Sequence, residues 1–519
     1  MHHDKRQRDR EQRSILRAGR LFLLATVLLA LADIPAAPAM AAEADSAGDP
    51  RLSDPTWAPG RQAIAERLAA TPLTRRARNV ILFIGDGMGV STVTAMRIYV
   101  GQQKGLPGEE YVLPFERFPY TALVKTYNVN AQVPDSAGTA SALYTGIKTD
   151  IGVLAIRSGA DGDCRAMQPV PTILEELEDR GFATGIVTTT RLTHATPAAA
   201  YAHAPDRDWE ADADMPKSAR EAGCRDIAAQ FAGFSHGDGI DVALGGGRAS
   251  FLPASQGGRR KDGRDLIAAW KAAGNHRQVV TTARALAQFA PAPDSQLLGL
   301  FAPSHLAFDH DRRTRKLDQP SLARMTEAAI RLLQARTAGR ARGFFLMVEG
   351  GRIDHAHHAG NAFRALDEGR AFAEAVARAL ALVDPADTLV LVTADHSHTL
   401  TIAGYPPRGN PILGLSRRIR PDADSHHPVA LAADGRPYTT LGYLNGPGAG
   451  RQLPANARDA EVQDPDYRQE AAIPLRAETH SGEDVPLYAT GPGARLARGV
   501  MEQNAVYHLM RTALGIGGR

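Results

Sequence analysis

The chain is predicted to form an α/β fold, with a large, mainly parallel, doubly wound central sheet flanked by helices. Short apolar runs recur along the sequence without polar alternation, helical stretches separate them, and each run closes on a glycine or a polar turn. Strands of that kind are buried on both faces, as in a parallel sheet that helices cover. The predicted strands are residues 80–84, 183–189, 241–244, 344–348, 388–393 and 487–490.

The predicted helices between these strands have apolar stripes and recognisable ends. Residues 362–383 repeat apolar side chains at helical spacing, and residues 171–180 run into Gly181 as a stop signal. In an open sheet of this kind, ligands gather at the carboxyl ends of the strands. Polar side chains that follow a strand are therefore the first candidates for a functional site.

The amino-terminal segment, residues 1–41, is expected to be a secretory signal peptide. Residues 4–20 are rich in arginine, residues 21–32 are apolar, and residues 39–41 offer a small-x-small cleavage site. The apolar core is too short to cross a bilayer comfortably. We therefore expect export to the periplasm or the extracellular space, with no membrane span.

The rest of the chain is predicted to be a short lead followed by one large domain. Residues 42–78 form a Pro/Ala-rich segment with a short helix around residues 64–68, and residues 79–519 form the domain. Residues 252–320 look like an insertion, and residues 404–477 look like a Gly/Pro-rich, crown-like one. Both are expected to cover the functional site or a subunit contact.

Without the predicted signal peptide the chain is formally neutral. Its totals of 60 Lys+Arg and 57 Asp+Glu fall by seven and four, which leaves 53 of each. This balance argues against nucleic acid or an anionic membrane as the main partner.

The chain contains two cysteines, Cys164 and Cys224. In an oxidising compartment two cysteines most simply form one disulfide. Two unpaired buried thiols are the alternative.

The segment GDGMG at residues 85–89 follows a predicted strand and precedes a predicted helix. A dinucleotide-binding turn is one alternative, but the spacing is not the G-x-G-x-x-G fingerprint, and a plain tight turn is another. Asp86 would point a negative charge at a pyrophosphate, which is unfavourable for a dinucleotide and favourable for a cation. We therefore interpret Asp86 as a metal ligand.

A second group of candidate ligands follows the next apolar run. Asp354 and His358 stand four residues apart on one face of a helical turn, so both reach one ion, and their donors suit Zn²⁺. Glu349 ends the strand with a hard oxygen donor that suits Mg²⁺, although alone it would be a surface charge. His355 and His357 point elsewhere and are expected to be neighbours or surface groups rather than ligands.

Two further histidine-containing segments complete the candidate metal centre. Asp395 and His396 end the strongest predicted strand, which begins at Thr388, and ligate one ion if the backbone turns there. His398 would orient a neighbour or the substrate. His480, which follows Glu478 by two residues, supplies one more nitrogen, although a single histidine is more often structural.

A serine and an arginine are candidates for attacking and for binding a phosphate at this centre. Ser136, preceded by Asp135, stands at the start of a predicted helix, where phosphate binds and where a metal would stabilise the serine alkoxide. A serine that only caps the helix is the alternative. Arg207 can hold two phosphate oxygens with its planar fork, and a salt bridge with Asp206 or Asp208 is the alternative.

Together these segments resemble the alkaline phosphatases. The similarity runs in sequence order from about Asn79 to Tyr507, over the segments GDGMG, PDSAGTASALYTG, TTTRLTHATPAAAYAH, DADMPKSAREAGC, VEGGRIDHAHHAG, TADHSHT and ETHSGEDVPLYATGPGA. The resemblance implies a secreted, metal-dependent homodimer that hydrolyses small-molecule phosphate monoesters. Within this family Ser136 would be the nucleophile that becomes phosphoserine, and Arg207 would clamp the phosphate.

The resemblance also implies two zinc ions and one magnesium ion. Their ligands would be Asp354, His358 and His480 for the first zinc, Asp86, Asp395 and His396 for the second, and Asp86, Thr196 and Glu349 for the magnesium.

Further residues would support the ligands or the phosphate, namely Asp135, His194, His355 and His398. His194 and His355 match animal-type members, since some bacterial members have Asp and Lys there. Cys164 and Cys224 match a disulfide of the animal-type enzymes.

Two other functions fit parts of this pattern. A phosphodiesterase or sulfatase of the same superfamily is the nearest, although a clamp on three free oxygens disfavours a diester. A secreted phosphate- or metal-binding protein without turnover is the other, and Ser136 beside metal ligands argues against it.

Overall fold

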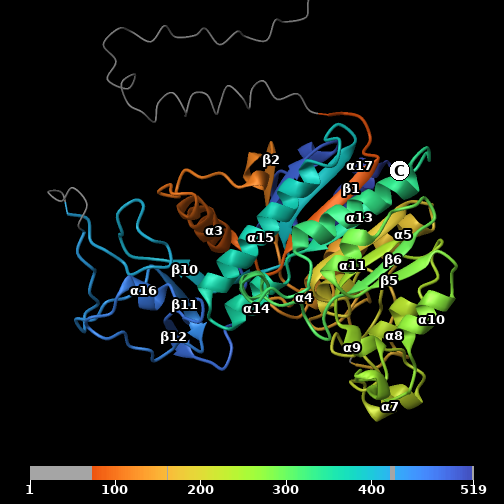
Figure 1. The fold of residues 1–519 in the computed structure, drawn as a ribbon, viewed down its shortest axis with the longest axis horizontal. Helices are drawn as coiled ribbons and strands as arrows, with labels where there is room; N and C mark the ends of the chain where they lie inside the picture. The colour runs from red at the N-terminus through yellow and green to blue at the C-terminus, as the bar shows by residue number, and fades with distance from the viewer. Residues whose placement is uncertain (1–72, 161, 421–426, 517–519) are drawn as a thin grey trace, which may run out of the picture. The chain divides into compact units, whose positions relative to one another are not determined.

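The computed structural model describes residues 73–160, 162–420 and 427–516. Within them a ten-stranded sheet forms the centre of the fold, and helices pack against it (Figure 1). The predicted signal peptide and the helix expected at residues 64–68 lie outside the described residues.

The strands of the central sheet follow the order β15-β2-β14-β8-β1-β7-β3-β4-β6-β5. Among these ten, β14 alone runs against its neighbours, so the predicted mainly parallel α/β sheet is confirmed. The strands are β1 (Asn79–Gly85), β2 (Tyr120–Lys125), β3 (Ala183–Arg191), β4 (Val242–Gly246), β5 (Arg277–Val280), β6 (Gln296–Leu300), β7 (Phe344–Glu349), β8 (Thr388–Ala394), β14 (Val485–Thr490) and β15 (Gly499–Glu502).

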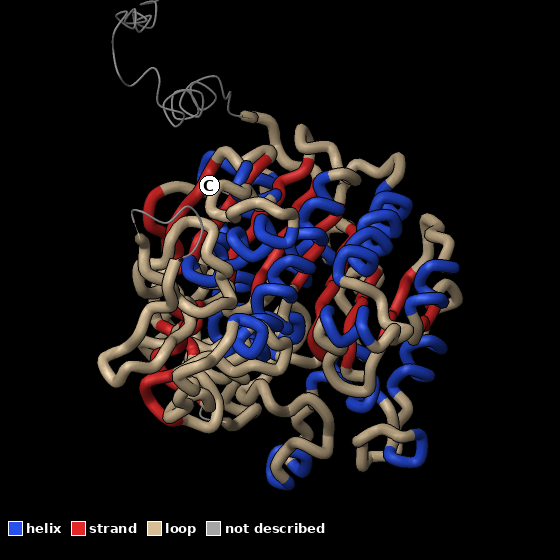
Figure 2. Tube along the Cα trace, turned by 60° about the vertical axis from the view of Figure 1, so that its left-hand side comes forward, coloured by secondary structure: helices blue, strands red, loops and turns tan. Residues whose placement is uncertain are grey.

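Helices cover the sheet on both faces (Figure 2). The two longest, α13 and α15, pack against each other, and a side-chain oxygen caps the start of each. The α-helices are α3 (Val90–Gln103), α4 (Ser136–Thr145), α5 (Ile173–Glu178), α6 (Ala195–Ala198), α7 (Lys217–Glu221), α8 (Ile227–Ala232), α9 (Arg248–Phe251), α10 (Leu266–Ala272), α11 (Ala283–Gln288), α12 (Asp309–Thr314), α13 (Leu322–Thr337), α14 (Arg352–His358), α15 (Ala362–Leu380), α16 (Asp459–Val462) and α17 (Ala505–Leu514).

The register of the central strands explains where the functional residues meet. Every residue of β1, β7 and β8 is buried, as their uninterrupted apolar sequences predict. In the register of β1, Ile84 lies opposite Glu349 of β7, and Gly85 lies opposite Ala394 of β8. The three strands therefore end side by side, and the residues that follow them share one edge of the sheet.

The prediction that residues 252–320 form an insertion is wrong in part. This stretch supplies β5 and β6, which extend the sheet beyond β4. Each of these strands is only four or five residues long and lies between turn-rich segments. The composition of the stretch therefore does not indicate a strand. The strands β2 and β15 were also missed, because they lie at an exposed edge and lack a continuous apolar run.

The described residues of the stretch 404–477, with the strand just before it, build a small structure beside the main sheet. The strands β10 (Leu400–Ile402), β11 (Leu441–Gly446) and β12 (Ala471–Pro474) form a three-stranded sheet. Leu415, Leu453, Val462 and Tyr467 form a separate apolar cluster within this stretch. A second small sheet pairs β9 (Ser397–His398) with β13 (His480–Ser481), and so brings two predicted site histidines opposite each other.

Cys164 and Cys224 form the predicted disulfide, with Cα atoms 6.0 Å apart. Both pack against the cluster of Trp209, Met215 and Ala219. Because Trp209 lies two residues beyond Arg207, the disulfide anchors the segment that carries this arginine.

A buried acidic pair lies where α5 leads into β3. Glu178 is 2% exposed and accepts a hydrogen bond from the Thr184 hydroxyl, while its other oxygen has no partner among the described residues. Burial, reinforced by the nearby Asp241 carboxylate, raises the pKa of Glu178 to about 9. Asp241 itself pairs with Arg336.

Glu178→Gln is expected to reduce the loss of stability between about pH 5 and about pH 9. Over this range the carboxyl is protonated in the folded chain and ionised in the unfolded chain, so the wild-type free energy of unfolding falls as pH rises. The variant should be more stable than the wild type near the upper limit, by on the order of 1–3 kcal/mol. Thermal unfolding at both pH values measures this, with Glu221→Gln at an exposed glutamate as the control. A Glu178→Gln variant that keeps the wild-type pH dependence would contradict the prediction.

Candidate active site

The predicted ligands gather at the carboxyl ends of β1, β7 and β8. Asp86 follows β1, Glu349 ends β7 and Asp395 follows β8, and all three side chains are fully buried. Helix α14 follows β7 after two residues and carries Asp354 and His358. The parallel sheet thus brings together residues that are far apart in the sequence.

The GDGMG turn needs glycine because the site closes tightly around it. Gly87 has φ +67°, and its N–H donates to the Asp395 carboxylate over 3.0 Å. A Cβ atom at Gly87 would lie 2.3 Å from a ring carbon of His398, and one at Gly89 would lie 1.8 Å from the Ser397 hydroxyl oxygen. The turn therefore holds Asp86 and Asp395 together only because these side chains are absent.

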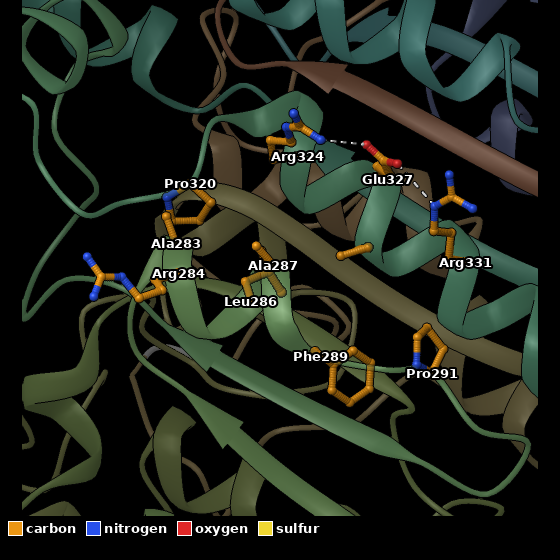
Figure 3. Close-up of a pocket in the computed structure, with 11 residues that line it drawn as sticks. Ala283, Arg284, Leu286, Ala287, Phe289, Pro291, Pro320, Arg324, Glu327 and Arg331 are labelled. Carbon is orange, nitrogen blue, oxygen red and sulfur yellow. Dashed lines mark hydrogen bonds and ion pairs between the residues drawn. The ribbon is translucent and has the colours of Figure 1, made fainter.

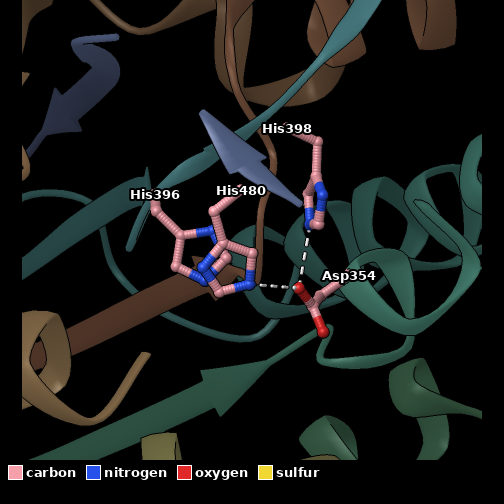
Figure 4. Close-up of side chains that lie close together, drawn as sticks. All are labelled: Asp354, His396, His398 and His480. Atoms are coloured by element: carbon pink, nitrogen blue, oxygen red, sulfur yellow. Dashed lines mark hydrogen bonds and ion pairs between the residues drawn. The ribbon is translucent and has the colours of Figure 1, made fainter. Parts of the chain in front are cut away.

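One group of ligand atoms surrounds the carboxylate of Asp354 (Figure 4). Its Oδ1 lies 2.8 Å from Nε2 of His398 and 3.2 Å from Nε2 of both His358 and His480. Nε2 of His358 and Nε2 of His480 are 3.1 Å apart. Burial opposes ionisation, but these imidazoles hold the pKa of Asp354 well below its usual value.

Backbone carbonyls orient two of these rings. Nδ1 of His480 donates to the Pro134 carbonyl over 2.8 Å, and Nδ1 of His358 donates to the Glu478 carbonyl. Each bond leaves the lone pair of Nε2 facing Asp354, which is the tautomer that a metal ion requires.

A second group consists of Asp86, Asp395 and His396, all fully buried. Nε2 of His396 lies 3.4 Å from Asp86 Oδ1 and 3.4 Å from Asp395 Oδ2. The hydroxyl oxygen of Ser136 lies 3.0 Å from Nε2 of His396 and 3.4 Å from Asp86 Oδ1. The serine and this group therefore share one set of contacts.

A third group is formed by Asp86, Glu349 and His194, whose ligand atoms lie within 4.8 Å of one another. The hydroxyls of Thr188 and Thr190 donate to one oxygen of Glu349.

Several polar atoms of these groups are buried without a hydrogen-bond partner in the described part of the chain. They are Asp86 Oδ2, His194 Nδ1, Thr196 Oγ1, Glu349 Oε1 and Asp395 Oδ2. Burial raises the pKa of Asp86 and of Asp395, neighbouring carboxylates raise both further, and burial raises that of Glu349 to about 7. Unpaired oxygens and crowded carboxylates are costly in a protein interior, and bound cations remove both costs.

The phosphate-binding candidates meet at the start of α4. Asp135 caps this helix by accepting from Gly138 N–H over 3.1 Å, and it pairs with Arg207 over 2.9 Å. Arg207 also donates to Nε2 of His194 over 3.2 Å. The guanidinium thus stands beside Ser136 with its orientation fixed, and the alternative pairings of Arg207 with Asp206 and Asp208 do not occur.

Two residues at the site had not been identified from the sequence. Glu478 lies 2.5 Å from Nδ1 of His398 and also accepts from Thr399, and its carboxylate and Asp354 raise the pKa of His398 to about 10 against the effect of burial. The ETH motif offered a signal for it, since Glu478 stands two residues before His480. His305, on the loop after β6, packs its ring against His355 with no comparable motif.

His357 is buried, and its ring packs against that of His398, with the ring centroids 4.7 Å apart. Its ring nitrogens contact the Thr92 hydroxyl over 3.1 Å and the Tyr443 hydroxyl over 2.8 Å. It therefore connects α14 to α3 and β11.

The site is distinct from an apolar groove on the molecule (Figure 3). That groove, of about 530 Å³, lies between α11 and α13, with Leu286 and Phe289 among its lining residues. It contains none of the predicted ligands. The polar groups at the strand ends, and not this groove, therefore form the candidate active site.

Buried carboxylates and imidazoles in metal-binding groups, beside a serine and an arginine, define a metal-dependent hydrolase of an α/β fold. Comparison with known proteins identifies the family. The alkaline phosphatase family model matches residues 77–516. The chain belongs to the alkaline phosphatase family, which is metal-dependent, and it is a phosphomonoester hydrolase.

Relatives and solved structures agree with this assignment. A tissue-nonspecific alkaline phosphatase of Gallus gallus is 46% identical over 461 residues, covering 85% of each chain. An alkaline phosphatase of Gadus morhua is 44% identical over 462 residues, covering 85% of this chain and 92% of its own. The crystal structure of Thermus thermophilus alkaline phosphatase has a TM-score of 0.62 at 28% identity, covering 86% of this chain and 93% of that one.

Over the described residues, none of the helices has the length and apolarity that a bilayer crossing requires.

Gly87→Ala is expected to lower the melting temperature and the metal content of the purified protein. The new methyl group would meet the His398 ring, in a backbone conformation that costs a side chain about 1–2 kcal/mol by itself. Gly105→Ala is the matched control, because Gly105 also has positive φ (76°) but has nothing within 4 Å of the added Cβ. Calorimetry and elemental analysis compare the two. Equal losses in both variants would mean that the contact with His398 is unimportant.

Proposed function

We propose that the chain hydrolyses phosphate monoesters by in-line displacement, through a covalent phosphoserine on Ser136. The observation that carries this proposal is the position of the Ser136 hydroxyl, 3.0 Å from Nε2 of His396 and 3.4 Å from Asp86 Oδ1. Ser136 is also the first residue of α4, where unpaired backbone N–H groups favour a phosphate.

The first two groups of ligand atoms suit two zinc ions. The oxygens of Asp86 and Glu349 in the third group, together with the buried Thr196 hydroxyl rather than His194, suit one magnesium ion. Asp354, His358 and His480 would hold the first zinc, Asp86, Asp395 and His396 the second, and Asp86, Thr196 and Glu349 the magnesium. Mixed nitrogen and oxygen donors are typical of zinc and all-oxygen donors of magnesium, and the unpaired buried oxygens support bound cations. When bound, the cations supply charge stabilisation for the entering and leaving oxygens and acidify the serine hydroxyl and a water.

The protein's own side chains position the phosphate for this reaction. Arg207 offers a planar pair of donors to two non-bridging oxygens, and Asp135 keeps that fork in place. Ser136 forms a bond to phosphorus while the bond between phosphorus and the alcohol oxygen breaks, and the serine proton ends on the departing alcohol. A water then attacks the phosphoserine, its oxygen joins the released inorganic phosphate, and one of its protons restores the serine hydroxyl. His194 contacts Arg207 and His398 contacts Asp354, so these two histidines act on the clamp and on a proposed ligand rather than on the substrate.

A phosphodiesterase or sulfatase remains the alternative. A diester carries one negative charge fewer than a monoester and bears an extra substituent on phosphorus, so the positive charge of Arg207 favours a monoester. Turnover of a phosphate monoester, a diester and a sulfate ester of the same leaving group distinguishes the three activities.

We further propose export and a homodimer, with residues 79–519 as one catalytic domain. The apolar, arginine-preceded segment at residues 21–32 and the disulfide support export to an oxidising compartment. Tyr405, Leu444 and Ile473 of the crown-like insertion are 91%, 54% and 49% exposed and support a subunit contact there.

Ser136→Ala is expected to lower kcat by on the order of a thousandfold or more while leaving the zinc content unchanged. The alanine removes the nucleophile but none of the proposed ligands. Stopped assays of monoester hydrolysis measure kcat, acid trapping measures the amount of phosphoserine, and elemental analysis measures the zinc content. Ser218→Ala, at an exposed serine, is the control. Normal phosphoserine trapping in Ser136→Ala would refute the assignment of the nucleophile.

Arg207→Ala is expected to raise the inhibition constant of inorganic phosphate roughly ten- to a hundredfold, because charged hydrogen bonds to the anion are lost. Arg165→Ala, at an exposed arginine that pairs with Asp163, is the control and should leave the constant unchanged. An unchanged constant in Arg207→Ala would count against its role as the clamp.

A further inference from the structure

A line of basic side chains leads away from the phosphate clamp. Arg207 contacts His194 over 3.2 Å, and the ring of His194 lies 5.4 Å from those of both His305 and His355. The rings of His305 and His355 are 4.2 Å apart, and His355 Nδ1 lies 3.1 Å from Nη1 of Arg352. We call these five residues the basic strip.

Arg352, at the far end of the basic strip, differs from the arginines near it. Arg207 pairs with Asp135 over 2.9 Å, and Arg191 pairs with Glu210 through several contacts. In the described part of the chain no carboxylate lies within ion-pair distance of Arg352, and its Nε is buried without a hydrogen-bond partner.

The acidic side chains closest to Arg352 do not neutralise the positive charge of its guanidinium. Burial raises the pKa of Glu368 to about 8, so this carboxyl is mostly uncharged at neutral pH. Asp311 is paired with Arg364 over 3.1 Å. The charge of Arg352 therefore lacks an anion, although the residue begins the same helix, α14, that carries Asp354.

A purely structural role accounts for only part of this arrangement. The guanidinium lies 3.8 Å from the ring centroid of Phe308, a cation–π contact that stabilises its position. Such a contact does not neutralise the charge, and a half-buried cation without an anion is costly. Phe308 therefore explains how the guanidinium is held but leaves its positive charge without a counter-ion.

We propose that Arg352, with His355 beside it, binds a second phosphoryl group on the alcohol side of the substrate. This inference rests on the proposed function, in which Arg207 holds the phosphoryl group that is cleaved. It assigns to the chain a preference for doubly phosphorylated substrates, bisphosphate esters or diphosphates, over monoesters of neutral alcohols. The planar fork of an arginine suits a phosphoryl group that does not react.

Arg352→Gln tests this preference. In the wild-type, metal-loaded enzyme, kcat/KM is measured for alkanediol bisphosphates of increasing length, for inorganic pyrophosphate, and for the matching alkyl monophosphates at one pH and ionic strength. The variant should lose roughly tenfold or more in kcat/KM on the preferred bisphosphate and change little on the alkyl monophosphate. Arg352→Lys, which keeps the charge without the fork, should recover part of the loss. The preferred length distinguishes a bisphosphate ester from pyrophosphate.

Arg364→Gln is the matched control. Its guanidinium lies 5.6 Å from the same Phe308 ring but pairs with Asp311 and Asp466, so neither substrate should be affected. An Arg352→Gln variant that loses activity equally on both substrates, or on neither, would overturn the inference. A wild-type enzyme that hydrolyses none of the monophosphates would instead refute the proposed function, so the two failures are distinguishable.

Discussion

The buried negative charge at the ends of three central strands is the constraint on which the rest of the structure depends. Asp86, Glu349, Asp354 and Asp395 share one edge of the sheet, away from solvent, where like charges repel strongly. The imidazoles that surround Asp354 offset only part of this charge. The remaining unpaired oxygens are compatible with a stable fold when divalent cations occupy the three groups of ligands.

This constraint links the fold to the chemistry. Parallel strands in register deliver the carboxylates to one level, and the glycines of the turn after β1 let them approach. The helix that begins at Ser136 and the pairing of Asp135 with Arg207 then bring the proposed nucleophile and the proposed anion clamp to the same edge. Rigid elements thus fix most of the reacting groups, which is the preorganisation that phosphoryl transfer requires.

Much of this arrangement could be predicted from the sequence, and the limits have physical causes. Uninterrupted apolar runs identify β1, β7 and β8, and their carboxyl ends identify Asp86, Glu349 and Asp395. The edge strands and the short β5 and β6 were missed because their local sequences carry no continuous apolar signal. The contact of His305 with the site could not be predicted, since the loop after β6 brings this residue there only in the folded chain. No local sequence pattern indicates such a contact.

The most direct test of the metal-centred account is elemental analysis of the purified chain, combined with monoester assays before and after chelation. The account predicts two zinc ions and one magnesium ion per chain, loss of hydrolysis and a lower melting temperature after chelation, and recovery of both when the ions are restored. A chain that is purified without divalent metal and hydrolyses monoesters at the same rate in the presence of a chelator would contradict it.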